Sequence, residues 1–146
     1  MSIAQDRRRV LGVDPGSRRI GLAIGVSGVA SPFTVIERHR DLAVTMRTMA
    51  TIVAEEEINV VVVGLPLHLD GTEGKSAKAA RTFVASLSKF IDVPVTFHDE
   101  RLTTVTADRA MLDAGVKAPE RRRNVDKIAA AVMLQSWLDS RAPGEI

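Results

Sequence analysis

The sequence has no cysteine and no tyrosine, and it is poor in aromatic residues generally. One tryptophan and four phenylalanines make up the whole aromatic complement of its 146 residues. Without cysteine, disulfides, zinc–thiolate sites and thiol nucleophiles are excluded. With so few aromatic side chains, several of them on apolar faces, the chain offers no obvious platform for stacking nucleic-acid bases. Any recognition of nucleic acid would therefore depend on phosphates and shape.

Long apolar runs are also missing. The longest, residues 60–67, is interrupted by Gly64 and Pro66 and is too short to cross a bilayer. The polar residues before Val10 are not followed by an apolar stretch of signal-peptide length. We therefore expect a cytoplasmic protein with no membrane partner.

The length predicts one domain. A chain of 146 residues is large enough for a hydrophobic core and is too short for two domains of ordinary size. We expect a single domain over residues 1–146, with residues 1–8 and 141–146 as flexible tails.

The formal net charge is only +2, but the basic residues are clustered. Such clusters can neutralise phosphates, although each can also be an ordinary solvated surface. The clusters are Arg7–Arg9, Arg18–Arg19, Lys75 with Lys78 and Arg81, and Arg121–Arg123.

Hydrophobic periodicity predicts the element order βββαβαβαα, which indicates an α/β fold with a mixed five-stranded sheet flanked by helices. Asp41 is a plausible N-cap for the first helix and Asn124 for the last. The predicted strands are 10–13, 20–26, 33–36, 60–63 and 93–97, and the predicted helices are 42–55, 77–91, 104–114 and 124–137.

Three carboxylates occupy positions that invite a functional explanation. Asp14 ends the first strand, and alternation places it on the same face as Val10 and Gly12. Glu100 lies just past the fifth strand, at the strand edge where sites of α/β sheets form. Asp126 precedes Ala129, Ala130, Met133 and Trp137, so it heads the apolar face of the last helix.

Each acid also has a structural interpretation: a turn residue, a solvated strand end and a favourable charge in a first helical turn. Three carboxylates held together repel one another unless a cation is present. Mg²⁺ or Mn²⁺ suits such oxygen ligands, and a pair of these ions is a common solution for phosphoryl displacement.

Four separated motifs resemble those of the YqgF-type family of pre-16S rRNA nucleases, which are also described as Holliday-junction-resolvase-like. The resemblance covers nearly the whole chain, in order. The motifs are VDPGSRRIGLA at 13–23, GLPL with DGT at 64–72, DERLTT at 99–104 and DKIAA at 126–130.

The resemblance implies a ribonuclease-H-like fold and trimming of the 5′ end of a 16S rRNA precursor. It implies a catalytic metal site matching Asp14, Glu100 and Asp126. Our own hypothesis is that Asp14 bridges two Mg²⁺ or Mn²⁺ ions and that Glu100 and Asp126 each hold one. We expect the loop 66–74 and the segment 117–123 to contact phosphates. The predicted substrate-binding residues are Arg18, Arg19, Lys75, Arg101, Arg121, Arg122 and Arg123.

Three further positions bear on this scheme. Related nucleases often use a fourth acid, for which Asp99 is the nearest candidate. His68 stands where a different polar residue is expected. His98 could assist proton transfer, but the strand end favours a surface histidine.

Other functions compete with this hypothesis. A DNA junction resolvase would use the same acids but act as a dimer, so both a monomer and a homodimer remain possible. A non-catalytic nucleic-acid-binding protein in transcription or ribosome assembly is a further alternative. A P-loop is excluded, since Leu69 stands where its first glycine is required. ATPases that resemble actin close two domains around the nucleotide, for which this chain has no room.

Overall fold

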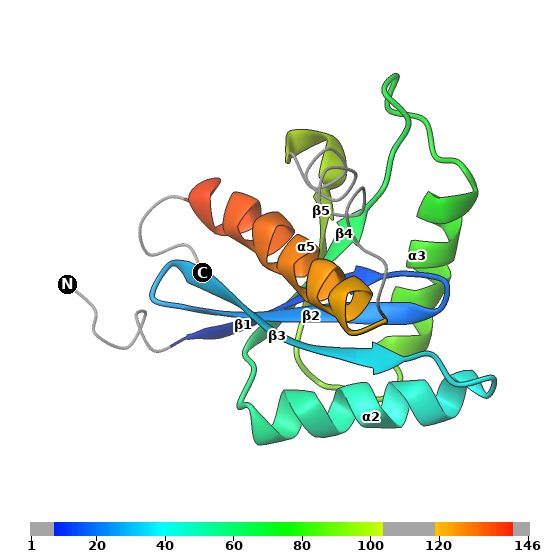
Figure 1. Ribbon diagram of the computed structural model, residues 1–146, viewed down its shortest axis with the longest axis vertical. Coiled ribbons are helices and arrows are strands. Elements are labelled where there is room, and N and C mark those ends of the chain that lie inside the picture. Colours follow the sequence, from blue (N-terminus) through cyan, green and yellow to red (C-terminus); the bar gives the residue numbers. More distant parts are fainter. Residues whose placement is uncertain (1–7, 104–118, 142–146) are drawn as a thin grey trace.

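Five strands form one mixed sheet in the order β3-β2-β1-β4-β5 (Figure 1). The computed structural model describes residues 8–103 and 119–141. Strands β1, β2 and β3 pair antiparallel, whereas β4 pairs parallel with both β1 and β5. The strands are β1 (Arg9–Pro15), β2 (Arg19–Val26), β3 (Val29–Glu37), β4 (Val60–Leu65) and β5 (Val95–Asp99).

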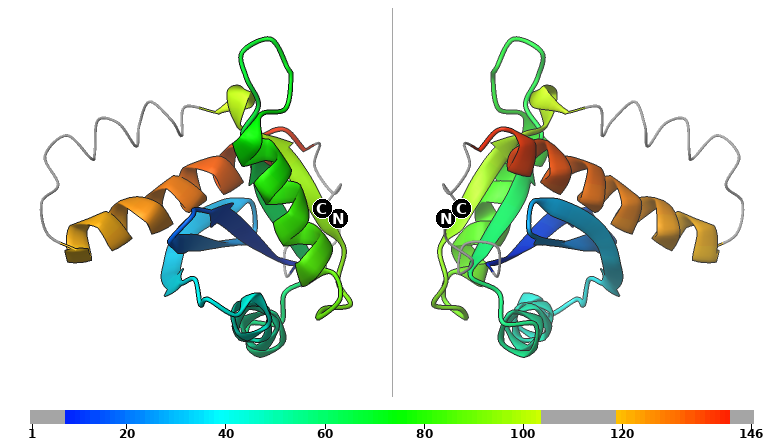
Figure 2. Two further views of the ribbon diagram at one scale, coloured as in Figure 1. Left: turned by 90° about the vertical axis from the view of Figure 1, so that its right-hand side faces the viewer. Right: turned by 90° about the vertical axis from the view of Figure 1, so that its left-hand side faces the viewer.

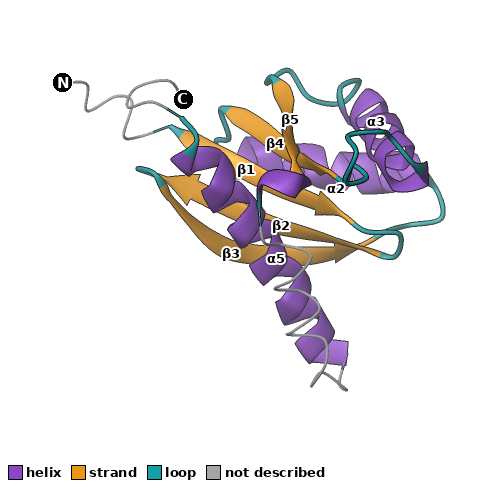
Figure 3. Ribbon diagram, turned by 90° about the horizontal axis from the view of Figure 1, so that it is seen from above, coloured by secondary structure: helices purple, strands orange, loops and turns teal. Residues whose placement is uncertain are grey.

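Helices cover both faces of this sheet. Helix α5 (Pro119–Asp139) lies across one face, and α2 (Leu42–Glu55) and α3 (Lys75–Leu87) pack on the other (Figures 2 and 3). A short 3₁₀ turn, η1 (Glu100–Leu102), follows β5 directly. Within the described ranges, none of the helices is long and apolar enough to cross a membrane.

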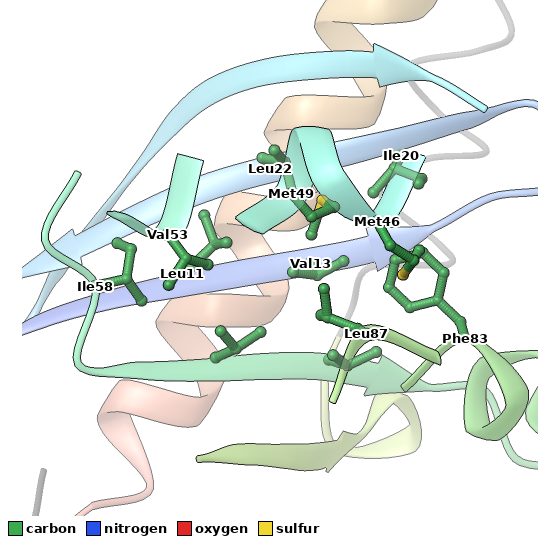
Figure 4. Close-up of a cluster of buried hydrophobic side chains, with 12 residues drawn as sticks. Leu11, Val13, Ile20, Leu22, Met46, Met49, Val53, Ile58, Phe83 and Leu87 are labelled. Atoms are coloured by element: carbon green, nitrogen blue, oxygen red, sulfur yellow. The ribbon is translucent and has the colours of Figure 1, made fainter. Parts of the chain in front are cut away.

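The core beneath α2 and α3 is built from large apolar side chains. Met46 and Met49 of α2 and Phe83 and Leu87 of α3 point toward β1 and are fully or almost fully buried (Figure 4). Because the strands alternate, Leu11 and Val13 contribute to this core, as the sequence predicts. Burial of such side chains contributes about 1.5–3 kcal/mol each relative to exposure.

The core beneath α5 combines small residues at the closest contacts with the large helix side chains Met133, Leu134, Trp137 and Leu138. Gly12 faces Leu134 so closely that an added Cβ would lie 2.8 Å from the Leu134 Cβ atom. Ala129, Ala130 and Ala131 of the helix are buried against the same face. The small side chains on both surfaces let the backbone of α5 approach the strands.

The predicted element order is confirmed wherever the structure describes the chain, although several boundaries differ. Strand β3 is longer than predicted, β5 is displaced two residues toward the C-terminus, and α3 begins at Lys75 and ends earlier, at Leu87. The helix predicted at 104–114 falls outside the described residues.

The predicted start of the last helix is wrong. Helix α5 begins at Pro119 rather than near Asn124, so Asn124 lies inside the helix and is not its N-cap. Proline is favoured in a first helical turn, where its missing N–H is not needed, and Glu120 adds a favourable charge there. Asp126 therefore lies two turns into the helix.

Phe83 offers a test of the core beneath α3. Its side chain is 1% exposed, whereas Phe90, just beyond the helix, is 37% exposed. We expect Phe83→Ala to lower the free energy of unfolding by about 3–5 kcal/mol, because it leaves a large cavity. Urea denaturation of Phe83→Ala and of the matched control Phe90→Ala would measure this. Equal losses in the two variants would contradict the assignment of Phe83 to the core.

Candidate active site

Asp14 lies at the end of β1 on the face covered by α5. Its side chain is only 7% exposed. Gly21 is its cross-strand partner on β2. On the other side, Val13 pairs with Val63 of β4, so the next residues along the two parallel strands are Asp14 and Gly64. Asp14 therefore stands in the middle of the sheet with a glycine on each neighbouring strand.

The carboxylate of Glu100 occupies the space above Gly64. A Cβ atom added to Gly64 would collide with Oε1 of Glu100. Glu100 is the first residue of η1, immediately after β5. The predicted position just past the fifth strand is thus confirmed, with the strand ending at Asp99 rather than Phe97.

The backbone of α5 at Asp126 occupies the space above Gly21. A Cβ atom added there would collide with the carbonyl oxygen of Asp126. The Asp126 side chain also reaches β2, where Arg19 Nε donates a hydrogen bond of 2.6 Å to its Oδ2 atom. The predicted inward orientation of Asp126 on the last helix is therefore confirmed.

The three acids thus lie on one face of the sheet, around the end of β1. Glycine flanks Asp14 on both sides, Glu100 lies over one glycine and Asp126 over the other. Among residues 8–103 and 119–141, no three acidic or histidine side chains are gathered closely enough to hold a metal ion. The assignment of Asp14, Glu100 and Asp126 as metal ligands remains a prediction.

Asp99, the candidate for a fourth acid, is paired with Arg101. The Arg101 side chain donates from Nε and Nη2 to the Asp99 carboxylate, with a shortest distance of 2.7 Å, and its backbone N–H donates as well. These hydrogen bonds hold the pKa of Asp99 below its usual value. Arg101 Nη1 also donates to the Leu69 carbonyl. This pair therefore joins η1 to the loop that follows β4.

That loop, residues 66–74, has ordered internal contacts. Leu67 and Glu73 form an isolated antiparallel bridge, and the His68 N–H donates to the Thr72 carbonyl. Asp70 accepts from the backbone and hydroxyl of Thr72, and these bonds lower its pKa. An added Cβ at Gly74 would collide with the His68 ring, so the exposed His68 side chain lies against the end of the loop.

The predicted substrate-binding residues fall into two groups. Arg19, Arg101 and Arg123 form ion pairs with Asp126, Asp99 and Glu37. The other group is exposed at the surface: Arg18 just before β2, Lys75 at the start of α3, and Arg121 and Arg122 in the first turns of α5.

His98 is not the surface residue that its strand-end position predicts, because it is buried with 5% exposure. Its Nε2 atom lies 3.0 Å from the Ser136 hydroxyl of α5, which donates onward to the Leu102 carbonyl. Burial lowers the pKa of His98 and favours the neutral ring. Since the Ser136 proton points to Leu102, His98 Nε2 is the donor to Ser136. This chain of hydrogen bonds ties η1 to α5.

An open groove of about 400 Å³ lies beside this network, lined by Leu102, Thr103, Val132, Gln135, Ser136 and Asp139. None of the three predicted metal ligands lines it. The sequence alone does not identify Ser136 as a site-building residue, and it does not show that Asp126 and Glu100 occupy the space above Gly21 and Gly64. Glycines inside predicted strands were the available signal, since they often mark a close approach.

The two glycines beside Asp14 should respond differently to an added methyl group. At Gly21 it meets backbone atoms of Asp126, so the helix must move. At Gly64 it meets the end of a flexible glutamate side chain. We expect Gly21→Ala to lower the free energy of unfolding by about 1–3 kcal/mol and Gly64→Ala by clearly less. Denaturant unfolding measures both, and equal losses would contradict the close backbone packing at Gly21.

Known proteins resemble this chain in sequence over most of its length. A curated protein of Anaeromyxobacter sp. (strain Fw109-5), named "Putative pre-16S rRNA nuclease", is 45% identical over 135 residues, covering 91% of this chain and 98% of that protein. Proteins with the same name from Myxococcus xanthus and Roseiflexus sp. are each 40% identical, covering 92% and 91% of this chain and 90% and 95% of those proteins.

Solved structures support the fold. Thermus thermophilus RuvC in complex with a Holliday junction substrate matches with a TM-score of 0.62 at 16% identity, covering 94% of this chain and 98% of RuvC. A second structure of T. thermophilus RuvC matches with a TM-score of 0.54 at 17% identity, covering 91% and 95%. These matches confirm the predicted ribonuclease-H-like α/β fold.

The family predicted from the motifs is confirmed as well. A family model described as "RuvX: Holliday junction resolvase" matches residues 8–140, nearly the whole chain. Together with the curated relatives, this match shows that the chain belongs to the RuvX family.

Proposed function

We propose that this protein is a metal-dependent nuclease that hydrolyses phosphodiester bonds and trims the 5′ end of a 16S rRNA precursor. The observation that carries the proposal is the placement of Asp14, Glu100 and Asp126 on one sheet face, made possible by glycine on both sides of Asp14. The names of relatives 40–45% identical to this chain support RNA as the substrate.

The donor chemistry of the three acids suits a hard divalent cation. All three predicted ligands are carboxylates, the donors that Mg²⁺ and Mn²⁺ prefer. Asp14 is buried, and Asp126 already has a cationic partner in Arg19. Both facts indicate that this edge of the sheet favours positive charge. Asp14, Glu100 and Asp126 would hold the metal ions.

The protein contributes positioning and charge to the reaction. When bound, the metal ions supply Lewis acidity and lower the pKa of the attacking water. Asp14 is held in place by strands on both sides, while α5 and η1 fix Asp126 and Glu100. Exposed Arg18, Lys75, Arg121 and Arg122 would bind backbone phosphates and orient the scissile bond. The products would carry a 5′-phosphate and a 3′-hydroxyl.

DNA junction resolution is the second candidate. The description of the matching family model favours it, and the fold is shared with RuvC. The acids do not discriminate between the two substrates, because the chemistry is the same. The oligomeric state does discriminate between them, because a resolvase needs two active sites to cut two strands, whereas trimming of one RNA end needs a single active site. We place the RNA activity in the cytoplasm, with a monomer sufficient for it.

Replacement of Asp14 tests the proposal. We expect Asp14→Asn to reduce cleavage of a 16S precursor fragment by about a hundredfold or more, because several kcal/mol of transition-state stabilisation depend on the metal ions. Cleavage would be measured with Mg²⁺ or Mn²⁺ and with EDTA. The matched control is Asp92→Asn, which alters an exposed aspartate between α3 and β5.

A four-way DNA junction assayed in parallel identifies the substrate. Metal-dependent symmetric cuts in the junction, without trimming of the RNA, would favour the resolvase. Cleavage of neither substrate by a folded wild-type protein would favour a non-catalytic binding role. Undiminished cleavage by Asp14→Asn would show that Asp14 is not part of the active site.

The salt dependence of RNA binding tests the exposed arginines of α5. Each lost phosphate contact should reduce the slope of log K against log salt concentration by about 0.7–0.9. We therefore expect a shallower slope for Arg121→Gln/Arg122→Gln, measured by fluorescence anisotropy in EDTA. The control is Arg47→Gln/Lys89→Gln, which removes two exposed charges, one from α2 and one from the turn that follows α3. An equal change in both double variants would contradict a role for α5.

A further inference from the structure

The ion pair of Arg19 with Asp126 joins a predicted phosphate-binding residue to a predicted metal ligand. Arg19 Nε lies 2.6 Å from Asp126 Oδ2, and the two side chains are 28% and 15% exposed. The residues are 107 positions apart in the chain. The close contact of α5 with Gly21, two residues after Arg19, brings them together. The ion pair is therefore one of the contacts that hold α5 on the sheet.

A second ion pair makes a similar connection close by. Arg123, one helical turn before Asp126, donates to Glu37 at the end of β3. Glu37 is the cross-strand partner of Arg19. In Figure 1 the start of α5 lies over the start of β2 and the end of β3. The two pairs thus link the same helix to the same corner of the sheet, but only one contains a proposed metal ligand.

We propose that Arg19 is an internal counter-ion for Asp126, which a divalent metal ion has to displace. This inference rests on the proposed function, since it assumes that Asp126 binds metal. The backbone at Asp126 lies over Gly21, the cross-strand partner of the buried Asp14, and a carboxylate on this face of the sheet is stabilised by a compensating cation. The Arg19 guanidinium is permanently charged and supplies this compensation before metal binds.

Competition for the same carboxylate has a consequence for metal affinity. An ion that needs the Asp126 oxygen bound by Arg19 binds only the fraction of molecules in which the pair is open, so its apparent affinity is reduced by that fraction. Arg19 is therefore a positioning residue that sets the metal affinity of the site. After displacement its guanidinium stays beside the site, where it can bind a phosphate oxygen.

Binding of Mn²⁺ alone, measured by calorimetry and by thermal shift without substrate, tests this role. We expect Arg19→Gln to lower the Kd for Mn²⁺ about three- to fivefold, the upper part of the range that corresponds to an ion pair of this exposure. Without metal, Arg19→Gln should melt at a lower temperature than the wild type. Added Mn²⁺ should raise the melting temperature of Arg19→Gln by more than it raises that of the wild type. Arg19→Lys keeps the charge and should bind Mn²⁺ within about twofold of the wild type.

The matched control is Arg123→Gln, which removes the same charge and the neighbouring helix–sheet ion pair. Its Kd for Mn²⁺ should stay close to that of the wild type. An equal decrease in Kd for Arg123→Gln and Arg19→Gln would show an effect of net charge and overturn the inference. An unchanged or higher Kd for Arg19→Gln, in protein folded by circular dichroism, would overturn it as well.

Asp14→Asn separates this inference from the proposed function. If the wild type binds Mn²⁺ through Asp14 but Arg19→Gln leaves the Kd unchanged, only the counter-ion role is wrong. If the wild type does not bind Mn²⁺, or binds it equally well without the Asp14 carboxylate, the metal site itself is wrong. The counter-ion role is then wrong with it, since no metal competes for Asp126.

Discussion

The close packing of α5 on the sheet is the constraint on which the candidate site depends. Gly12 and Gly25 accommodate Leu134, and Gly21 accommodates the backbone at Asp126. A larger side chain at any of these positions would push the helix outward. Because one side chain and one carbonyl are fitted into glycine positions, the helix cannot slide along the strands without collisions. The position of Asp126 beside β2 follows from this fixed register.

The two faces of the sheet have different roles. On the α2 and α3 face, methionine, leucine and phenylalanine side chains fill a thick core and supply much of the apolar burial. On the α5 face, alanine and glycine bring backbones close at the expense of buried volume. A helix that must present a carboxylate beside a strand end needs such an approach. The face that carries none of the three acids has a core of large apolar side chains, and the α5 face adds Met133, Leu134, Trp137 and Leu138 to the buried surface.

The sequence predicts most of the fold, and it predicts the face on which each acid lies. Alternation in β1 places Asp14 opposite Leu11 and Val13, and helical spacing places Asp126 with Ala129 and Ala130. Both inferences use only local periodicity, which the tertiary structure here does not override. The motifs at the ends of the strands also identify the family, and the family in turn implies the order and direction of the strands in the sheet.

What the sequence did not predict depends on partners distant in the chain. The Arg19–Asp126 pair spans 107 residues, and the collisions above Gly21 and Gly64 arise only after strands, helix and turn have assembled. The prediction that His98 is a surface residue is wrong because it used only the position at a strand end, whereas Ser136 of α5 covers the His98 side chain. The prediction that Asn124 caps the last helix is wrong for a local reason. Asparagine is a favourable N-cap residue, but Pro119 is also a favourable start, and the helix begins there.

Charge at the end of β1 links the fold to the proposed chemistry. Asp14 is buried by strands on both sides, and the same packing that buries it brings Asp126 close to β2. Placing carboxylates in such a position is unfavourable unless cations compensate them. Arg19 supplies part of that compensation from within the chain, next to the glycine that admits the helix. Helix packing and charge compensation are thus coupled, because the residue that neutralises Asp126 and the residue that seats it belong to the same strand. In the proposed function, Arg19 holds Asp126 in place of a metal ion, and a bound ion would replace that guanidinium.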